Sequence, residues 1–66
     1  MAETELERAQ RLFDEGAARI ERQRALISEL RADGHADLAE KAAQLLGQLL
    51  ALQAEHEANL RKLRSP

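Results

Sequence analysis

The sequence contains no cysteine, valine, tryptophan or tyrosine, and it has one phenylalanine, Phe13, and one proline, Pro66. Without cysteine the chain forms no disulfide, and it has no thiolate nucleophile and no cysteine-bound zinc site. With two isoleucines and a single aromatic residue, a β-sheet has little to build from. The apolar runs are far shorter than the roughly 20 residues that span a bilayer, so no membrane segment is expected.

Alanine, leucine and charged residues make up most of the 66 residues, a composition typical of long helices and coiled coils. The apolar fraction of 44% and the net charge of −2 argue against a disordered chain. The same charge balance gives no bulk attraction to nucleic acid or anionic lipid. The acidic start, with Glu3 and Glu5, lacks the positive charge of a secretory or transit peptide, so a cytoplasmic location is expected.

Two capping boxes and one glycine divide the chain into two helices. Residues 4–7 (Thr-Glu-Leu-Glu) and 37–40 (Asp-Leu-Ala-Glu) both have the capping-box spacing, and Gly34 suits the left-handed residue that follows a helix. We therefore predict an all-α fold with a single domain over residues 1–66: a helix over about 4–33, a turn at 34–36 and a helix over about 37–64. The short connection makes this an antiparallel, coiled-coil-like hairpin.

Apolar and small residues recur in steps of three and four along both predicted helices, as in a coiled-coil seam. In the first helix this seam comprises Leu6, Ala9, Phe13, Gly16, Ile20, Gln23, Ile27 and Leu30. In the second helix it comprises Leu38, Ala42, Leu45, Leu49, Leu52, His56, Asn59 and Leu63. Folding about the turn places Gly16 opposite Gln53. The predicted ion pairs at i,i+4 are Glu7–Arg11, Glu15–Arg19, Asp37–Lys41 and Glu57–Arg61.

Two helices alone bury too little apolar surface to offset the entropy of ordering the chain. Leucines beside both seams also make the apolar stripe wider than one neighbouring helix covers. We therefore predict that two hairpins pair into a four-helix bundle, a symmetric homodimer, with a trimer, a heteromeric bundle or a monomer with a leucine-rich surface as the alternatives. The residues expected in the core and dimer interface are Leu12, Phe13, Ile20, Gln23, Leu26, Ile27, Leu46, Leu49, Gln53, His56 and Leu60.

No nucleophile–base pair, phosphate-binding loop or inward-facing carboxylate pair is recognisable, so we expect no enzyme activity, no catalytic residue, no cofactor and no metal site. His35 in the turn and His56 on the seam are too far apart to share a ligand. Gln23 and Gln53 are polar residues of the kind that fix register in coiled coils. Gly47 lies within a helix, where it costs about 1 kcal/mol against alanine, without an evident reason.

The favoured function is a non-enzymatic protein–protein interaction or structural module that acts as a homodimer. Its candidate face for a further protein partner comprises Gly47, Leu50 and Ala54, where small residues allow close helix approach. The alternative is a weak nucleic-acid- or regulator-binding protein that uses the stretch Arg19–Arg31. Interleaved Glu21 and Glu29 make nucleic-acid binding the less favoured of the two.

A longer pattern resembles a known group of proteins. The residues are Arg19-Ile20-x-x-Gln23-Arg24-x-Leu26-Ile27-x-x-Leu30, then Gly34-His35, then Ala42-x-x-Leu45-Leu46-x-x-Leu49, and His56. Over about residues 19–60 the chain is similar to small bacterial helical-hairpin proteins with the same Gln-Arg-x-Leu-Ile core and glycine turn. That group has no activity to transfer. The resemblance implies a hairpin in which Gln23, Arg24 and the Gly34 turn belong to a shared design.

Overall fold

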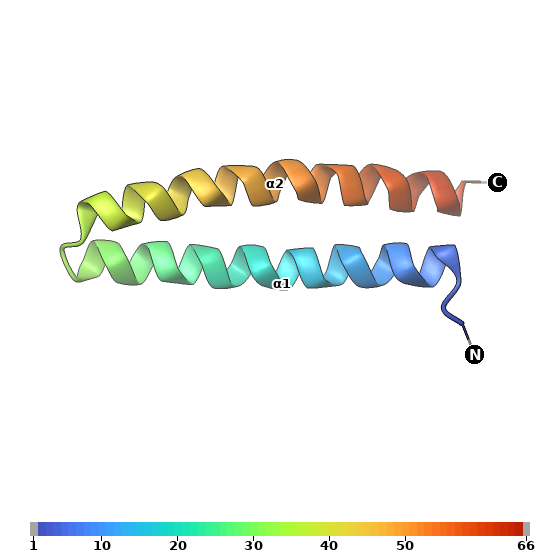
Figure 1. Ribbon diagram of the computed structural model, residues 1–66, viewed down its shortest axis with the longest axis horizontal. Helices are drawn as coiled ribbons and strands as arrows, with labels where there is room; N and C mark the ends of the chain where they lie inside the picture. The colour runs from blue at the N-terminus through green and yellow to red at the C-terminus, as the bar shows by residue number, and fades with distance from the viewer. Residues whose placement is uncertain (1, 66) are drawn as a thin grey trace.

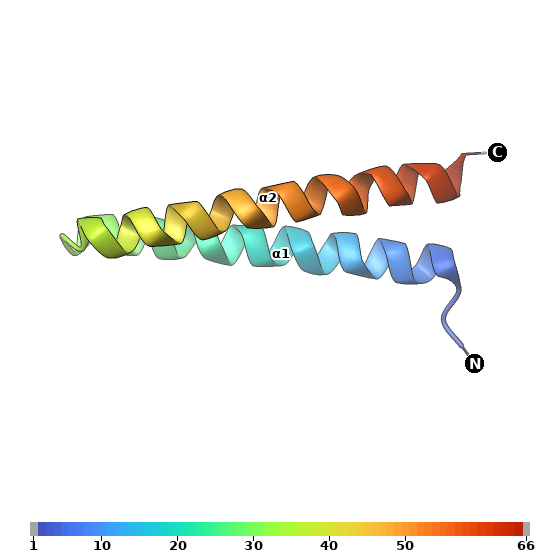
Figure 2. The same ribbon diagram turned by 45° about the horizontal axis from the view of Figure 1, so that its top comes forward.

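The computed structural model describes residues 2–65, which form two long helices joined by a tight turn (Figure 1). Helix α1 spans Glu5–Ala32 and helix α2 spans Ala36–Arg64. They run antiparallel and lie side by side along their whole length in both views (Figures 1 and 2). The predicted all-α antiparallel hairpin is therefore confirmed. Met1 and Pro66, the two ends of the predicted domain, lie outside the described residues.

Helix α1 begins where the first capping box predicts. The backbone N–H of Glu7 donates to the Thr4 hydroxyl over 3.1 Å, and the Thr4 N–H donates to the Glu7 carboxylate over 3.0 Å. Both bonds satisfy groups that otherwise lack an intrahelical partner at the first turn. The first predicted helix start is confirmed in position and in chemistry.

The turn ends α1 with a Schellman motif centred on Gly34. Gly34 N–H donates to the Arg31 carbonyl and His35 N–H donates to the Leu30 carbonyl, over 3.1 and 2.8 Å. Gly34 has φ of +79°, the left-handed conformation that glycine adopts without the penalty a Cβ brings. The chain reverses direction in this motif with only Asp33, Gly34 and His35 outside the two helices.

The predicted capping box at Asp37 is wrong. α2 begins at Ala36, its N-cap is His35, and no side chain caps it. Because the Schellman motif is complete at His35, the helix starts immediately afterwards, and Asp37 already lies in the first turn. There its charge favours the positive end of the helix dipole without serving as the cap.

The seam of α1 lies as predicted except at Leu6, which is 41% exposed, and in α2 every second seam position is shifted by one residue. Leu38, Leu45, Leu52 and Asn59, predicted on the seam, are exposed. The buried or half-buried residues of α2 recur instead as Ala39, Ala42, Leu46, Leu49, Gln53, His56, Leu60 and Leu63. The exposed set and the buried set both repeat every seven residues, so periodicity does not distinguish them, and the prediction follows the set that is richer in leucine. Small Ala39 and Ala42 beside the turn allow the close helix approach that a tight hairpin needs.

Replacing Gly34 with alanine is expected to lower the free energy of unfolding by about 1–2 kcal/mol, the cost of left-handed backbone for a residue with a Cβ. Urea unfolding followed by circular dichroism measures this at a fixed chain concentration. The matched control is Gly47→Ala. A Cβ at Gly47 meets nothing within 4 Å, so that variant gains about 1 kcal/mol from helix propensity. Equal stability of Gly34→Ala and the parent chain would contradict the assignment.

Candidate functional site

Two glutamines join the helices through main-chain carbonyls. The Gln23 amide donates to the Ala42 carbonyl over 2.8 Å, and the Gln53 amide donates to the Phe13 carbonyl over 2.9 Å. These bonds lie at two levels of the hairpin and point in opposite directions across the seam, so together they hold the helices in one register. Gln53 Oε1 is buried without a hydrogen-bond partner among the described residues.

Gly16 provides the space that Gln53 occupies. A Cβ added at Gly16 would lie 2.0 Å from Gln53 Oε1 and 3.0 Å from its Cδ, so no larger residue fits while Gln53 keeps its place. The predicted pairing of Gly16 with Gln53 is confirmed by this contact. Gln53 therefore lies against α1 because residue 16 lacks a side chain.

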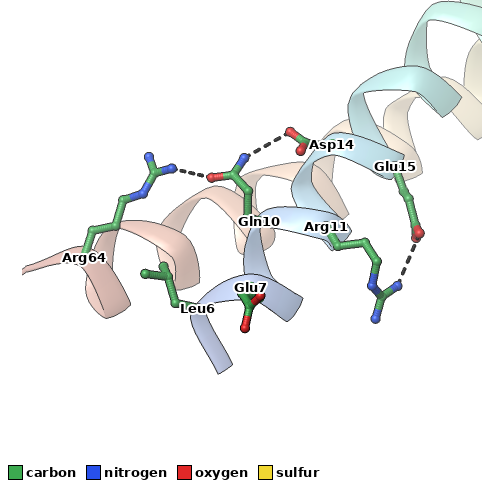
Figure 3. Close-up of a pocket in the computed structure, with 7 residues that line it drawn as sticks. All are labelled: Leu6, Glu7, Gln10, Arg11, Asp14, Glu15 and Arg64. Atoms are coloured by element: carbon green, nitrogen blue, oxygen red, sulfur yellow. Dashed lines mark hydrogen bonds and ion pairs between the residues drawn. The ribbon is translucent and has the colours of Figure 1, made fainter. Parts of the chain in front are cut away.

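At the open end of the hairpin, a polar network surrounds a hollow of about 540 Å³ (Figure 3). Arg64 donates to Gln10, which donates in turn to Asp14, and Arg11 pairs with Glu15 over 3.2 Å. The described carboxylates and cations around this hollow are exposed. Leu6 is the one apolar side chain that lines it. The hollow is open to solvent, and its floor is formed by Leu6 and the apolar stems of the polar side chains around it, so it offers no enclosed site for chemistry.

Two carboxylates at this end are stabilised in their charged form. The Arg11 guanidinium donates to Glu3 over 2.9 and 3.0 Å, which lowers the pKa of Glu3. The Thr4 backbone N–H donates to Glu7 and lowers the pKa of that carboxyl too. Of the four predicted i,i+4 ion pairs, Glu57–Arg61 forms, at 2.7 Å, and the other three do not form within residues 2–65.

The capping carboxylate makes the start of α1 sensitive to acid. Because the pKa of Glu7 in the folded chain lies below its unfolded value, its contribution to stability is present above about pH 4.3 and is lost as the pH falls through the folded pKa. Glu7→Gln is expected to reduce the loss of thermal stability between about pH 5 and pH 2, measured by circular dichroism. Glu21→Gln, an exposed carboxylate in the middle of α1, is the control. Identical acid profiles for Glu7→Gln and the parent chain would contradict the expectation.

One side of the hairpin carries most of the leucines outside the seam. Successive residues of a helix are 100° apart, so the position before every second seam residue always lies on one side of the helix. In an antiparallel pair these positions of both helices lie on the same side of the hairpin. Here these positions hold five leucines, which we call the leucine face: Leu12, Leu26, Leu38, Leu45 and Leu52. Leu12 is half-buried, and the other four are 43, 51, 46 and 42% exposed in that order. Two grooves, of about 270 and 300 Å³, run beside Leu12. Leu52 and Arg19 line the smaller groove, and Asn59 lines the larger.

The opposite side of the hairpin is polar apart from one leucine. It carries Leu50, 43% exposed, together with Gln10, Arg24, Arg31, Glu57 and Arg64. The bond between Arg64 and Gln10 crosses the seam on this side. The two sides therefore differ in character, and the sequence-based prediction did not separate them. The signal was present, because the leucines at 38, 45 and 52 repeat every seven residues one position ahead of the true seam.

The residues predicted for the core and dimer interface fall into two groups. Ile20, Ile27 and Leu60 are buried between the two helices, and Phe13, Gln23, Leu46, Leu49, Gln53 and His56 are half-buried there. Leu12 and Leu26 lie on the leucine face. Gly47, Leu50 and Ala54, the candidate partner face, are exposed on α2 away from the leucine face.

The remaining candidate residues do not converge. His56 lines the smaller groove beside Glu15 and Arg19, whereas His35 is exposed in the turn. No group of three or more histidine, aspartate and glutamate residues within residues 2–65 is placed to hold a metal ion. Arg19 lies on the leucine face, whereas Arg24 and Arg31 lie on the opposite side. The stretch predicted as a nucleic-acid contact is thus divided between two faces.

Comparisons with models of known protein families, with curated proteins and with solved structures each found no match. The resemblance over residues 19–60 stays a prediction. Within the described residues, neither helix is long and apolar enough to cross a membrane.

Proposed function

We propose that the chain is a non-enzymatic protein–protein interaction or structural module that acts as a homodimeric four-helix bundle. The observation that carries this proposal is the leucine face, where four leucines remain between 42 and 51% exposed along one side of the hairpin. Contiguous apolar patches of this kind on small proteins mark interaction sites. The seam between α1 and α2 is already filled, so the leucine face needs a second partner.

The surface area of the hairpin supports the same proposal. The chain exposes 5188 Å², whereas a compact protein of 7.4 kDa exposes about 4,200 Å². The excess of about 1,000 Å² is close to the roughly 800 Å² that each partner buries in a stable interface. The excess surface follows from the shape: the Cα dimensions are 49 × 22 × 13 Å, so the hairpin is one helix thick. A second hairpin laid on it makes a bundle of ordinary proportions.

The polar side would remain accessible in such a dimer. Gly47, Leu50 and Ala54 lie on α2 outside the leucine face, so pairing of two hairpins leaves them free to contact a further protein. The exposed small residues at 47 and 54 suit close approach of another helix. The described residues provide no enclosed pocket with converging titratable groups, which supports a binding role over a catalytic one.

The test is the solution mass of the purified chain across a dilution series, by light scattering, with circular dichroism on the same samples. The expected result is a helical particle of twice 7.4 kDa that dissociates on dilution with loss of helix. A fully helical monomer at all concentrations would contradict the dimer. An unfolded monomer that becomes helical only with another protein would replace the homodimer with a heteromeric bundle.

A further inference from the structure

Two hairpins can stack on their leucine faces with twofold symmetry in two ways. Either the turns lie at the same end and α1 packs on the α2 of the second copy, or the turns lie at opposite ends and α1 packs on the α1 of the second copy. We infer that the turns lie at opposite ends, with the twofold axis near Ala18 and Arg19 at the midpoint of α1. This inference rests on the proposed homodimer.

The first support is the charge pattern at the outer edge of the leucine face. Along α1 this edge carries Arg8, Glu15, Arg22 and Glu29, which alternate in sign every seven residues, or about 10.5 Å. Arg8 and Glu15 line the two grooves beside Leu12, which places them at this edge; Glu15 is also paired with Arg11 of its own helix over 3.2 Å. An antiparallel pairing of two α1 helices about their midpoint sets Arg8 against Glu29 and Glu15 against Arg22, each twice by symmetry.

The second support is the apolar match about the same axis. The pairing that aligns the charges also sets Leu12 against Leu26 of the second copy. Leu52 and Arg19 line the same groove, so they lie at one level of the hairpin, and an axis at Arg19 sets Leu52 against its own copy on the α2 side. Because the axis passes through the middle of both helices, the two hairpins overlap along their full length.

The same-end arrangement brings like charges together. The outer edge of α2 carries Lys41, Gln48, Glu55 and Lys62. With the turns together, Glu15 would face Glu55 and Arg8 would face Lys62, while only Glu29 gains an opposite charge, from Lys41. Like-charge contacts across an interface act against an arrangement, so this one is disfavoured.

The opposite-end arrangement has three like-charge contacts of its own. Glu5 faces Asp33 of the second copy near the ends of α1, where both carboxylates are exposed to water. Lys41 faces Lys62 of the second copy at the ends of the bundle, where water screens both ammonium groups. Arg19 faces its own copy at the axis, with Glu15 one turn away in each chain. The long arginine stem can cover apolar surface while its guanidinium stays in water.

Single-cysteine variants test the arrangement cleanly, because the chain has no cysteine of its own. Arg19→Cys and His35→Cys are each purified as the full chain, checked for mass by light scattering, oxidised and run on a non-reducing gel. The expected result is a cross-linked dimer from Arg19→Cys and none from His35→Cys, whose copies lie about 50 Å apart. If light scattering shows a dimer, any other pattern of cross-linking overturns the arrangement. If the parent chain and both variants are monomeric, the result contradicts the proposed function instead.

A charge reversal provides a second test, because it weakens the dimer in one arrangement and strengthens it in the other. With the turns at opposite ends, the arginine introduced by Glu15→Arg faces Arg22 of the second copy. We therefore expect the dissociation constant of the dimer to rise about tenfold. Adding Arg22→Glu restores the pair and is expected to recover most of the lost affinity. A tighter dimer for Glu15→Arg, which in the same-end arrangement would face Glu55, overturns the inference.

Discussion

Replacing Leu52 with glutamate is expected to dissociate the proposed homodimer, raising its dissociation constant by about 100-fold or more. Leu52 lies on the leucine face at the level of Arg19, where each chain of the dimer contributes one copy. Each copy loses the burial of a leucine, about 1.5–3 kcal/mol, and brings a carboxylate into the interface, where Arg19 in the same groove offsets only part of the desolvation cost. Sedimentation equilibrium over a range of chain concentrations measures the change.

The matched control is Leu50→Glu on the same helix. Leu50 and Leu52 are 43 and 42% exposed in the hairpin, so they differ in the face that they occupy and not in how buried they are. Leu50→Glu is expected to leave the dimer intact. Equal weakening by both substitutions would show that the leucine face is not the dimer interface, and a stronger effect at Leu50 would move the interface to the opposite side.

Truncating Leu60 to alanine is expected to unfold most of the chain at 25 °C and micromolar concentration. Leu60 is 5% exposed, the most buried large side chain between the helices. A buried leucine-to-alanine change costs about 2–5 kcal/mol for the lost contacts and the cavity left behind. Chains of about 60 residues have little stability in reserve, so one such cavity in each hairpin is enough to unfold it. Circular dichroism against urea measures the loss.

The same chemical change at Leu50 serves as the control. Because its side chain is 43% exposed, Leu50→Ala removes little buried surface and is expected to cost about 1 kcal/mol or less. A Leu60→Ala chain that keeps the parent's helix content and midpoint would mean that the helices do not pack through Leu60. In that case the register set by Gln23 and Gln53 would also need revision.

The fold could be predicted from the sequence because its signals are local. The Thr4 and Glu7 capping box and the left-handed Gly34 each depend on a few neighbouring residues, and both appear in the structure as predicted. The start of α2 could not be predicted from the Asp37 pattern, because the Schellman motif ends at His35 and determines where the next helix begins. The Asp37 pattern and the Schellman motif place the start of α2 at different residues, and the hydrogen bonds of the turn determine which start the helix adopts.

The surface was harder to predict, because it depends on which of two heptad columns of α2 faces α1. Leucine occupies three of the four positions in the column of Leu38 and Leu45, so hydrophobicity favours that column for the seam. The structure instead buries alanines beside the turn and seats Gln53 against Gly16. Those contacts depend on shape and hydrogen bonding across the helix pair, and they leave the leucines outside for another partner.

The close contact between Gly16 and Gln53 has a consequence for how this chain can vary. A Cβ at residue 16 would stand 2.0 Å from Gln53 Oε1, so in a chain with any other residue at position 16 the Gln53 amide must move away or be replaced by a shorter side chain. Such a chain would also lose the bond to the Phe13 carbonyl that helps to set the register. The two positions are 37 apart in sequence and are coupled through this contact. Homologous chains that keep this hairpin should therefore show correlated substitution at the two sites.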